Sequence, residues 1–427
     1  MYQELADLEE RGEQLRVALV GAGSMGVGIA WQIGHTPGMT LASVTDIDMA
    51  AARRAAEAYG APYVVVAEGD ELPGPDTVVV TKSPFFLFER AADVGIDVMV
   101  EATNTIGFAA QACQAAIAAG AHVVLMNAEV DLALGPLLHH LGQQKGVVVT
   151  SDAGDQHGVL MRMIDEIRTW AFDITMAGNI KGFLNRYATA ESLAHEAQIR
   201  NLNPVQCCAY TDGTKLCVEM ALVSNATGLT AWVPGMEGPR ATDVHEVFDK
   251  FDFEKYDHGV VDYILGAEPG GGVFVVGYCD DPLQAEYLRY YKMGDGPFYL
   301  FYRPYHLCHL ETPRAIALAA QHGQPVLAPT FGRVSDVYAY AKKDLGPGVV
   351  VEHAIGGDEF YGMIDACSTA DAEGRVPIAL LESAGAERAV VKAALPQDRP
   401  LTYDDIALPE THVLRLFKRQ QELLGAG

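Results

Sequence analysis

The sequence lacks several features that would mark other classes of protein. No apolar run reaches the roughly 18 residues that a membrane-spanning helix needs. The seven cysteines include no CxxC pair of the kind that binds zinc or forms a redox motif. Residues 1–15 have neither a basic leader nor an apolar core, so they do not resemble a secretion signal. We therefore expect a soluble, cytoplasmic protein with free thiols.

The sequence has no internal repeats and no low-complexity tracts.

Positive charge is also scarce. The chain has 30 Lys and Arg against 56 Asp and Glu, which gives a formal net charge of -26. A surface of this kind repels nucleic acid and anionic membranes. The expected partner is a small-molecule substrate, and an anionic one has to be held by a local cluster of basic side chains.

The first third of the chain repeats one pattern, a β-branched run, a turn of small residues and an alanine-rich helical stretch. This pattern is typical of a parallel α/β sheet, and it predicts an N-terminal Rossmann domain over residues 1–158. The predicted strands are residues 16–20, 41–45, 63–66, 77–81, 97–100, 122–126 and 147–150, and the clearest helices are 25–35, 49–59 and 108–119.

The character of the sequence changes after residue 158. Residues 159–330 predict an α+β substrate or catalytic domain, with helices at 159–169, 190–200 and 215–224 and strands at 172–177 and 272–276. Residues 331–427 have short strands separated by Gly and Pro turns, which predicts a small, mainly β module and a C-terminal tail.

A glycine motif follows the first predicted strand and opens the first helix. Gly21, Gly23 and Gly26 have the GxGxxG spacing of a dinucleotide site. The first glycine allows the tight turn, the second lets the backbone approach a pyrophosphate, and the third packs helix on strand. The helix then begins near Ser24 and Met25, where its unpaired N–H groups favour an anion.

Asp46 ends the second predicted strand, about 20 residues after the motif, where such sites carry an acidic residue that binds the ribose hydroxyls. Its carboxylate would repel a 2′-phosphate, so Asp46 favours NAD over NADP. Arg53 and Arg54 follow and would instead suit a phosphate, or lie solvated on a helix. The expected cofactor is NAD or NADP.

Residues 100–104 (VEATN) and 119–127 (AGAHVVLMN) resemble homoserine dehydrogenase. The resemblance implies that Ala102, Thr103 and Asn127 line the nicotinamide pocket, and it continues through residues 196–198 and 212–216. The chain departs from those enzymes at Ala128, where they carry a lysine, and it has no regulatory ACT segment.

A closer resemblance is to the homoserine-dehydrogenase-like enzymes called DXR-like, which are similar in activity to 1-deoxy-D-xylulose 5-phosphate reductoisomerase of isoprenoid biosynthesis. Residues 152–158, 178–182, 210–215 and 292–309 carry this likeness, and the C-terminal module resembles the SAF-type domain of these proteins. The resemblance implies an NAD(P)-dependent oxidoreductase that forms a homo-oligomer.

Two lysines are candidates for the proton donor that hydride transfer to a carbonyl requires. Lys215 and Asp212 are three residues apart, which on one helix places both side chains on one face. The same region carries the catalytic Lys and Asp in homoserine dehydrogenases, and the alternative is a surface ion pair. Lys181 lies between Gly178 and Gly182, where backbone can approach a ligand, and the alternative is a solvated loop lysine.

Three basic side chains gather in an aromatic run near residue 300. Arg303, His306 and His309 would hold a phosphate or carboxylate of the substrate, or else belong to a domain interface. Asn179, two residues before the candidate Lys181, is a further substrate-binding candidate.

A divalent metal, Mg or Mn, would assist a rearrangement that precedes reduction. Glu129, Asp131 and Asp155 are the candidate ligands, because a Glu-x-Asp segment places both carboxylates on one side if the chain is extended. The alternative is that these acids cap helices or are solvated.

These observations leave three functional hypotheses. The first is an NAD(P)-dependent reductase of a small polar hydroxy-ketone, phosphorylated or not, such as 1-deoxy-D-xylulose 5-phosphate, with or without isomerisation. The second is an NAD-dependent dehydrogenase of a small polyol or hydroxy acid without rearrangement. The third is a non-catalytic sensor or scaffold that binds a dinucleotide.

Overall fold

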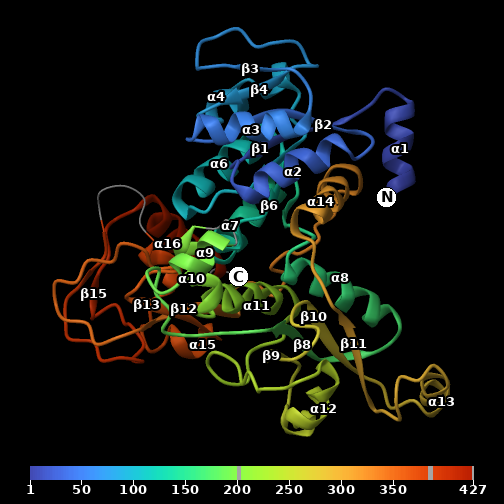
Figure 1. Ribbon diagram of the computed structural model, residues 1–427, viewed down its shortest axis with the longest axis vertical. Helices are drawn as coiled ribbons and strands as arrows, with labels where there is room; N and C mark the ends of the chain where they lie inside the picture. The colour runs from blue at the N-terminus through green and yellow to red at the C-terminus, as the bar shows by residue number, and fades with distance from the viewer. Residues whose placement is uncertain (200–202, 383–387, 426–427) are drawn as a thin grey trace. The chain divides into compact units, whose positions relative to one another are not determined.

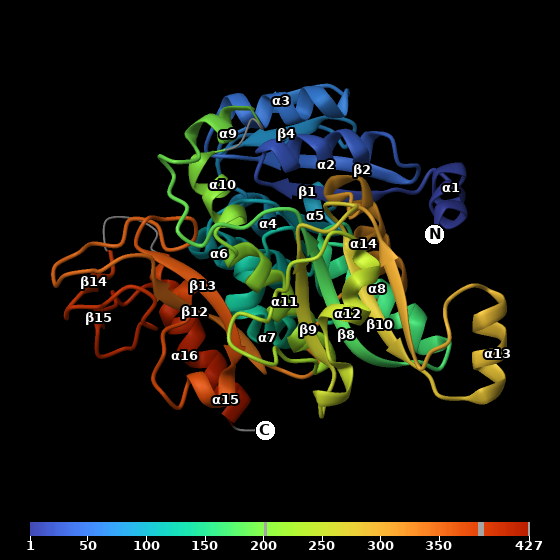
Figure 2. The same cartoon turned by 60° about the horizontal axis from the view of Figure 1, so that its bottom comes forward.

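The computed structural model describes residues 1–199, 203–382 and 388–425 (Figures 1 and 2). The chain forms two compact units that interleave along the sequence. Unit 1 comprises residues 1–155, 307–328 and 412–427, and unit 2 comprises residues 156–306 and 329–411. The three consecutive domains that the sequence suggests stay a prediction, and parts of the third one, residues 383–387 and 426–427, lie outside the described residues.

Unit 1 is built on a seven-stranded parallel sheet in the order β3-β4-β2-β1-β5-β6-β7. Without the short edge strand β3, this is the strand order of a dinucleotide-binding Rossmann sheet. All seven predicted strands are confirmed, and they read as nearly continuous apolar runs because a parallel sheet is covered on both faces. Their bounds are β1 Leu15–Val20, β2 Met39–Thr45, β3 Tyr63–Val65, β4 Val78–Thr81, β5 Val98–Glu101, β6 His122–Leu125 and β7 Val149–Ser151.

The helices of unit 1 form two packed groups. Helices α3, α2 and α14 contact one another in that order, and α4, α6, α7 and α16 do likewise. Two of these helices come from distant sequence, since α14 and α16 return to this unit after the chain has passed through unit 2. The bounds are α1 Tyr2–Glu10, α2 Ser24–Gly34, α3 Met49–Tyr59, α4 Phe85–Glu89, α5 Ala91–Val94, α6 Ile106–Ala119, α7 Ala128–Lys145, α14 Cys308–His322 and α16 His412–Gly425.

Unit 2 contains a mixed four-stranded sheet in the order β11-β10-β8-β9, in which only β8 and β9 run parallel. A separate antiparallel pair, β12 and β13, and a two-residue pair, β14 and β15, come from the later segment. The predicted strands near 172–177 and 272–276 are confirmed. The bounds are β8 Asp173–Lys181, β9 Val260–Leu265, β10 Val273–Tyr278, β11 Phe298–Arg303, β12 Ser335–Ala341, β13 Phe360–Ala366, β14 Val390–Val391 and β15 Ile406–Ala407.

Helix α11 is the centre of unit 2. Every one of its residues is buried, and it contacts α8, β9, β12 and β13. A helix that is buried on all sides can place polar side chains in the interior only where they find partners. The helices of unit 2 are α8 Gln156–Thr169, α9 Ala194–Ile199, α10 Pro204–Thr211, α11 Thr214–Thr227, α12 Val247–Lys250, α13 Pro282–Tyr290 and α15 Cys367–Ala370, with 3-10 turns at Val244–Glu246, Phe253–Lys255 and Ile378–Leu381.

Three local predictions need correction. Asp212 and Lys215 do not share a helix, because Asp212 is the C-cap of α10 and α11 begins only after Gly213, whose φ is +88°. The segment from Glu129 to Asp131 is not extended, since both residues lie in the first turn of α7. The helix predicted over 190–200 is shorter, and its last residue, Arg200, lies outside the described residues. Within the described parts of the chain, no helix has both the length and the apolar character to cross a membrane.

Candidate active site

The glycine turn between β1 and α2 has room for nothing larger than glycine at two positions. Gly21 has a φ of +96°, and a Cβ there would lie 2.5 Å from the carbonyl carbon of Ala102. A Cβ at Gly26 would lie 2.1 Å from the carbonyl oxygen of Gly21. Gly23 is the N-cap of α2, and a Cβ there would meet no atom within 4 Å. The turn therefore has no space for a side chain at Gly21 or Gly26, whereas the space beside Gly23 is open.

The open side of this turn is the N-terminus of α2. Gly23, Ser24 and Met25 are exposed there, and the N-cap residue, Gly23, has no side chain with which to cap the helix. The first N–H groups of a helix have no partner within it, and together with the helix dipole they favour an anion. The turn therefore fits the pyrophosphate of a dinucleotide on the geometry of its own backbone.

Asp46 follows β2 and holds the glycine turn in place. Its Oδ2 accepts a hydrogen bond from the N–H of Ala22 at 2.7 Å, and its Oδ1 accepts one from the N–H of Asp48 at 2.8 Å. A carboxylate has about four acceptor positions, so these two bonds leave capacity for the ribose hydroxyls of a cofactor. Arg53 and Arg54 are exposed on α3, and Arg54 lies 4.0 Å from Asp48.

A buried carboxyl group that sequence reasoning missed lies at the end of β5. Glu101 is fully buried, and burial raises its pKa to about 7. Its Oε1 accepts a hydrogen bond from the N–H of Thr103 at 3.0 Å, and no described atom pairs with its Oε2. The signal was present in the VEAT motif, because an acidic residue within an apolar strand needs a special reason.

Asn127 has a structural role at the end of β6. Its Oδ1 accepts a hydrogen bond from the N–H of Val130 at 3.2 Å, so it is the N-cap of α7, and its Nδ2 donates to the carbonyl of Thr105 at 3.2 Å. Asn127 thus links the β6–α7 turn to the segment that follows β5. Ala102 and Thr103 belong to that same segment, so the three residues that the resemblance assigns to the nicotinamide pocket lie at adjacent strand ends.

Unit 2 holds a cluster of four polar side chains, which we call the lysine cluster: Gln156, Asn179, Lys181 and Glu219. The Lys181 ammonium donates to the side-chain oxygen Oε1 of Gln156 at 2.8 Å and forms an ion pair with Glu219 at 3.6 Å. Asn179 Nδ2 donates to Gln156 Oε1 and, at 3.2 Å, to Glu219 Oε2. The lysine side chain is 17% exposed and that of Glu219 only 3%. Lys181 is thus not a solvated loop lysine but the end of β8, fixed by buried neighbours.

Two further features of the lysine cluster matter for chemistry. Asn179 is completely buried, and its Oδ1 has no described partner. Lys215 lies in the first turn of α11, is 8% exposed, and precedes Glu219 by four residues, which places both on one helix face. The two candidate lysines are thus related through Glu219, one by a direct ion pair and the other by helix geometry.

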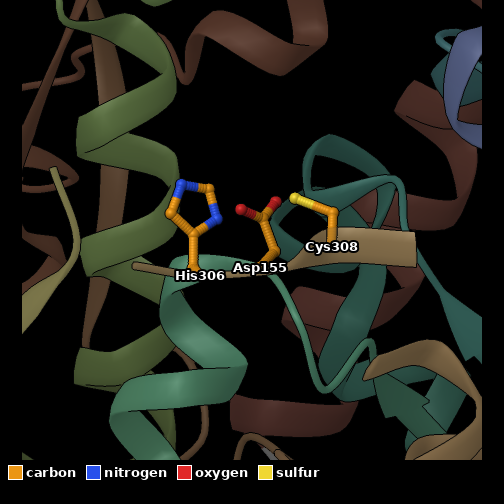
Figure 3. Close-up of side chains that lie close together, drawn as sticks. All are labelled: Asp155, His306 and Cys308. Atoms are coloured by element: carbon orange, nitrogen blue, oxygen red, sulfur yellow. The ribbon is translucent and has the colours of Figure 1, made fainter. Parts of the chain in front are cut away.

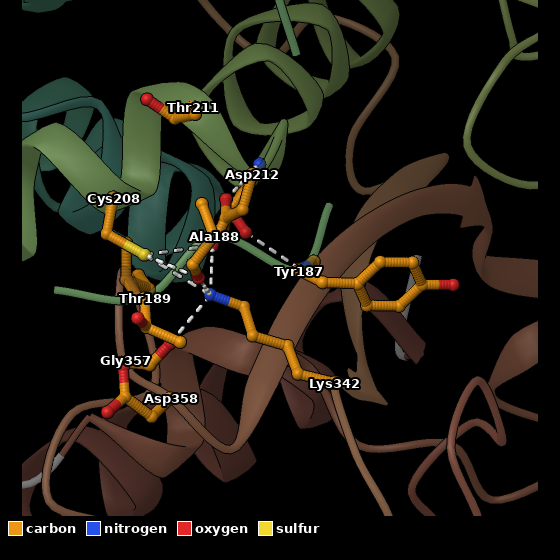
Figure 4. A network of polar contacts seen from close by, with 12 residues as sticks. Tyr187, Ala188, Thr189, Cys208, Thr211, Asp212, Lys342, Gly357 and Asp358 are labelled. Atoms are coloured by element: carbon orange, nitrogen blue, oxygen red, sulfur yellow. Dashed lines mark hydrogen bonds and ion pairs between the residues drawn. The ribbon is translucent and has the colours of Figure 1, made fainter. Parts of the chain in front are cut away.

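Asp212 pairs with a lysine that sequence reasoning did not consider (Figure 4). Its Oδ2 lies 2.8 Å from the Nζ of Lys342, and its Oδ1 accepts the N–H of Thr214 at 2.8 Å. The same ammonium donates to the carbonyls of Ala188 at 2.9 Å and Gly357 at 2.7 Å. Burial raises the pKa of Asp212, and the Lys342 ammonium acts in the opposite direction. Asp212 therefore belongs to a buried ion pair with Lys342, and its role beside Lys215 stays a prediction.

The three acids proposed as metal ligands do not form a single group. Asp131 is buried, accepts a hydrogen bond from the Ser151 hydroxyl, and has a pKa raised by burial to about 6. Glu129 is two residues away on the same helix, so the two side chains point to different sides of it. Asp155 lies instead beside Cys308, with a carboxylate oxygen within 4.8 Å of the thiol sulfur (Figure 3). A metal role for these residues stays a prediction.

The basic residues near position 300 are divided between the two units. Arg303 and His306 belong to unit 2, and the Arg303 guanidinium lies 4.6 Å from the centre of the Tyr305 ring. His309 belongs to α14 of unit 1, and its ring packs closely against Gly28. A Cβ added at Gly28 would lie 2.7 Å from the His309 ring. His306, which Figure 3 also draws, ends the first segment of unit 2.

Comparison with known proteins gives one match to a protein family. Residues 154–312 match the family described as "Oxidoreductase DRL, catalytic domain", which is less than half of the chain and includes the lysine cluster. The chain is an oxidoreductase. A comparison with curated proteins finds no match.

Solved structures share the fold only distantly. A probable dehydrogenase from Thermotoga maritima is 13% identical, with 73% of this chain and 90% of that chain covered and a TM-score of 0.43. A myo-inositol dehydrogenase from Corynebacterium glutamicum is 14% identical over 62% and 73%, with a TM-score of 0.38. An oxidoreductase from Agrobacterium radiobacter, solved with NAD+, L-tartaric acid and magnesium, is 14% identical, and the chain spans only 45% of its length, with a TM-score of 0.29. Scores this low assign none of these proteins' ligands to this chain.

Proposed function

We propose that this oxidoreductase uses NAD or NADP to interconvert a carbonyl and an alcohol on a small polar substrate, with Lys181 as the proton donor. The observation that carries the proposal is the environment of the Lys181 ammonium. It is nearly buried, it is oriented by Gln156 and Glu219, and it lies within the part of the chain that matches an oxidoreductase catalytic domain.

The cofactor part of the proposal is supported by the glycine turn of unit 1. Gly21 and Gly26 admit no side chain, and Gly23 leaves the helix N-terminus open. Asp46, which accepts a hydrogen bond from the Ala22 N–H of this turn, would also accept from the ribose hydroxyls. When bound, a nicotinamide dinucleotide supplies or accepts the hydride. Asp46 would disfavour a 2′-phosphate, so we expect NADH to bind more tightly than NADPH.

The residues of the lysine cluster would perform the proton transfer. As negative charge develops on the substrate oxygen, the Lys181 ammonium stabilises it and then gives up a proton to it. Glu219 and Gln156 hold the ammonium in one orientation throughout. Asn179 offers a buried carbonyl oxygen without a described partner, which would accept a hydrogen bond from a substrate hydroxyl.

Lys215 is the alternative proton donor. For the substrate, we propose two candidate classes. The likeness to DXR-like enzymes favours a hydroxy-ketone such as 1-deoxy-D-xylulose 5-phosphate, reduced with isomerisation, and we retain this as the first substrate to try. A small polyol or hydroxy acid, oxidised with NAD and without rearrangement, is the second.

The test measures NADH and NADPH oxidation with 1-deoxy-D-xylulose 5-phosphate, with and without Mg²⁺ or Mn²⁺, and NAD+ reduction with a panel of polyols and hydroxy acids. On the substrate that turns over, we expect Lys181→Met to lower kcat by about a hundredfold or more, which is the usual contribution of a general acid. Lys343→Met, at an exposed lysine of the same unit, is the control.

Each result decides between the alternatives. Loss of activity in Lys215→Met but not in Lys181→Met would move the proton donor to Lys215. Dinucleotide binding without turnover on any substrate would contradict an enzymatic role for the site and favour a dinucleotide-binding sensor.

A further inference from the structure

Unit 2 contains a pocket, which we call the Arg186 pocket. It has a volume of about 250 Å³, and its lining includes Arg186, Asp212, Gly213, Leu216, Tyr263 and Met363. No residue of the lysine cluster lines it. This volume suits a small metabolite.

The two charged side chains that line the pocket differ in whether their charge is compensated. Asp212 is neutralised by the buried ammonium of Lys342, at 2.8 Å. Arg186 is exposed, and among the residues that the structure describes no carboxylate forms an ion pair with it. Of the two charged side chains that line the pocket, Arg186 is therefore the one without a paired counter-charge.

The position of Arg186 is set by an aromatic side chain that is itself fixed. The guanidinium lies 5.1 Å from the centre of the Tyr361 ring, a cation–π distance. The Tyr361 hydroxyl donates to Asp398 at 2.9 Å, and its ring stacks on Tyr340 with centroids 5.8 Å apart. An arginine held in this way loses less conformational entropy when it binds a ligand.

Two other parts of the wall are a phenol, which can donate a hydrogen bond, and the N-terminus of a helix. Burial raises the pKa of Tyr263 to about 12, so its phenol keeps its proton at neutral pH. Gly213, the N-cap of the fully buried helix α11, has open space where a Cβ would point, so a ligand can come close to the start of that helix. Both features add to the contact that Arg186 offers an anion.

We propose that the Arg186 pocket binds the oxyanion group of a small metabolite, a phosphate or a carboxylate, through a charge-assisted contact with Arg186. The site is separate from the lysine cluster and goes beyond the proposed function, because it requires no cofactor and no turnover. Its ligand would contact the beginning of α11, the helix that carries Lys215 and Glu219 further along.

The test is isothermal titration of the cofactor-free protein with inorganic phosphate and, separately, with glycolate, at constant ionic strength. We expect Arg186→Gln to weaken binding of the recognised anion by about tenfold or more, as loss of a hydrogen bond to a charged group does. Arg186→Lys keeps the charge but not the planar fork, so it should weaken binding less. The control is Arg168→Gln, at an exposed arginine in the last turn of α8.

The two titrations identify the source of the oxyanion, since binding of phosphate alone indicates a phosphorylated ligand and binding of glycolate alone indicates a carboxylate. The proposal is overturned if neither anion binds the unmodified protein up to about 10 mM. It is equally overturned if Arg186→Gln binds as the unmodified protein does, or if Arg168→Gln loses binding to the same extent. Thermal unfolding of each variant without ligand shows whether a lost affinity reflects a lost fold.

Discussion

Glu101 is a carboxyl group that the fold buries completely while one of its oxygens has no described partner. Burial raises its pKa to about 7 from the ordinary value of 4.5, so the folded protein keeps a proton that the unfolded chain releases. Stability from this group is fully present below about pH 4.5 and is lost as the pH rises to about 7. Over this range the loss amounts to about 3 kcal/mol.

We therefore expect Glu101→Gln, which cannot ionise, to remove this pH dependence. The free energy of unfolding of the unmodified protein should fall relative to that of the variant between about pH 4.5 and 7. Denaturant titrations of both proteins at a series of pH values measure the difference. Asp131→Asn is a useful comparison, because burial raises the pKa of Asp131 only to about 6. The stability that the protonated Asp131 contributes should therefore be lost by a lower pH than that of Glu101. Parallel pH profiles of the unmodified protein and Glu101→Gln would contradict the assignment.

Lys342 is the second residue whose environment predicts a measurable effect. Its side chain is 2% exposed, and its ammonium neutralises Asp212, whose side chain is fully buried. Removing one partner of a buried ion pair leaves the other charge uncompensated, which costs about 3–5 kcal/mol. Lys342→Met should therefore lower the free energy of unfolding by about that amount, whereas Lys343→Met, at the neighbouring lysine with 56% exposure, should change it by less than about 0.5 kcal/mol. Equal effects of the two substitutions would show that the pair contributes nothing specific.

At the scale of elements, the turn from β1 to α2 separates the structural from the binding role of its glycines. A Cβ at Gly26 would overlap the Gly21 carbonyl, so Gly26→Ala should destabilise the fold of unit 1. A Cβ at Gly23 meets no protein atom, so Gly23→Ala should fold normally yet bind NADH more weakly, because it blocks the close approach of a pyrophosphate. Thermal unfolding and NADH fluorescence titration of both variants check this. Normal NADH affinity in Gly23→Ala would remove the pyrophosphate from this turn.

The elements also show what the sequence can and cannot predict. The seven strands of the parallel sheet were predictable, because strands buried on both faces are short apolar runs between regular turns. The segment around Asp212 was not, because the spacing from Asp212 to Lys215 fits a helix equally well until Gly213 takes a positive φ. The partner of Asp212 could not be predicted from local spacing either, because Lys342 comes from a distant segment of the chain and only the folded structure brings the two together.

The same limit holds for the candidate site. The glycine motif, Asp46 and Lys181 could be found by local spacing, since each belongs to a short phrase with a known chemical use. Glu219 and Gln156 could not, because each is joined to Lys181 only by folding, from positions 38 and 25 residues away. Sequence reasoning therefore finds the reactive side chain more readily than the side chains that orient it.

At the scale of the whole molecule, the chain returns to unit 1 at its end. Helix α16 packs on α7 and α6, although the chain passes through unit 2 after α7 and before α16. Pro136 lies inside α7, where a proline disturbs the regular hydrogen bonds of the helix. Gln420 of α16 lies at this point, with Oε1 accepting the N–H of Leu137 at 3.0 Å and Nε2 donating to the carbonyl of Ala133 at 3.0 Å. In an unbroken α-helix, the N–H of Leu137 would donate its hydrogen bond to this carbonyl of Ala133.

Gln420 thus supplies, from 283 residues away, the partners that two buried backbone groups need next to a proline. Gln420→Ala should leave both groups without them and lower the stability of unit 1 by about 2 kcal/mol, since each unsatisfied buried group costs about 1–3 kcal/mol and water can relieve part of the loss. Gln421→Ala, at the exposed neighbour, is the matched control and should be neutral. Hydrogen exchange of the α7 amides, together with the melting temperature, measures the effect. Faster exchange in Gln420→Ala that is confined to α7 and α16 is the expected result, and unchanged exchange there would mean that the C-terminal helix does not stabilise unit 1 through this side chain.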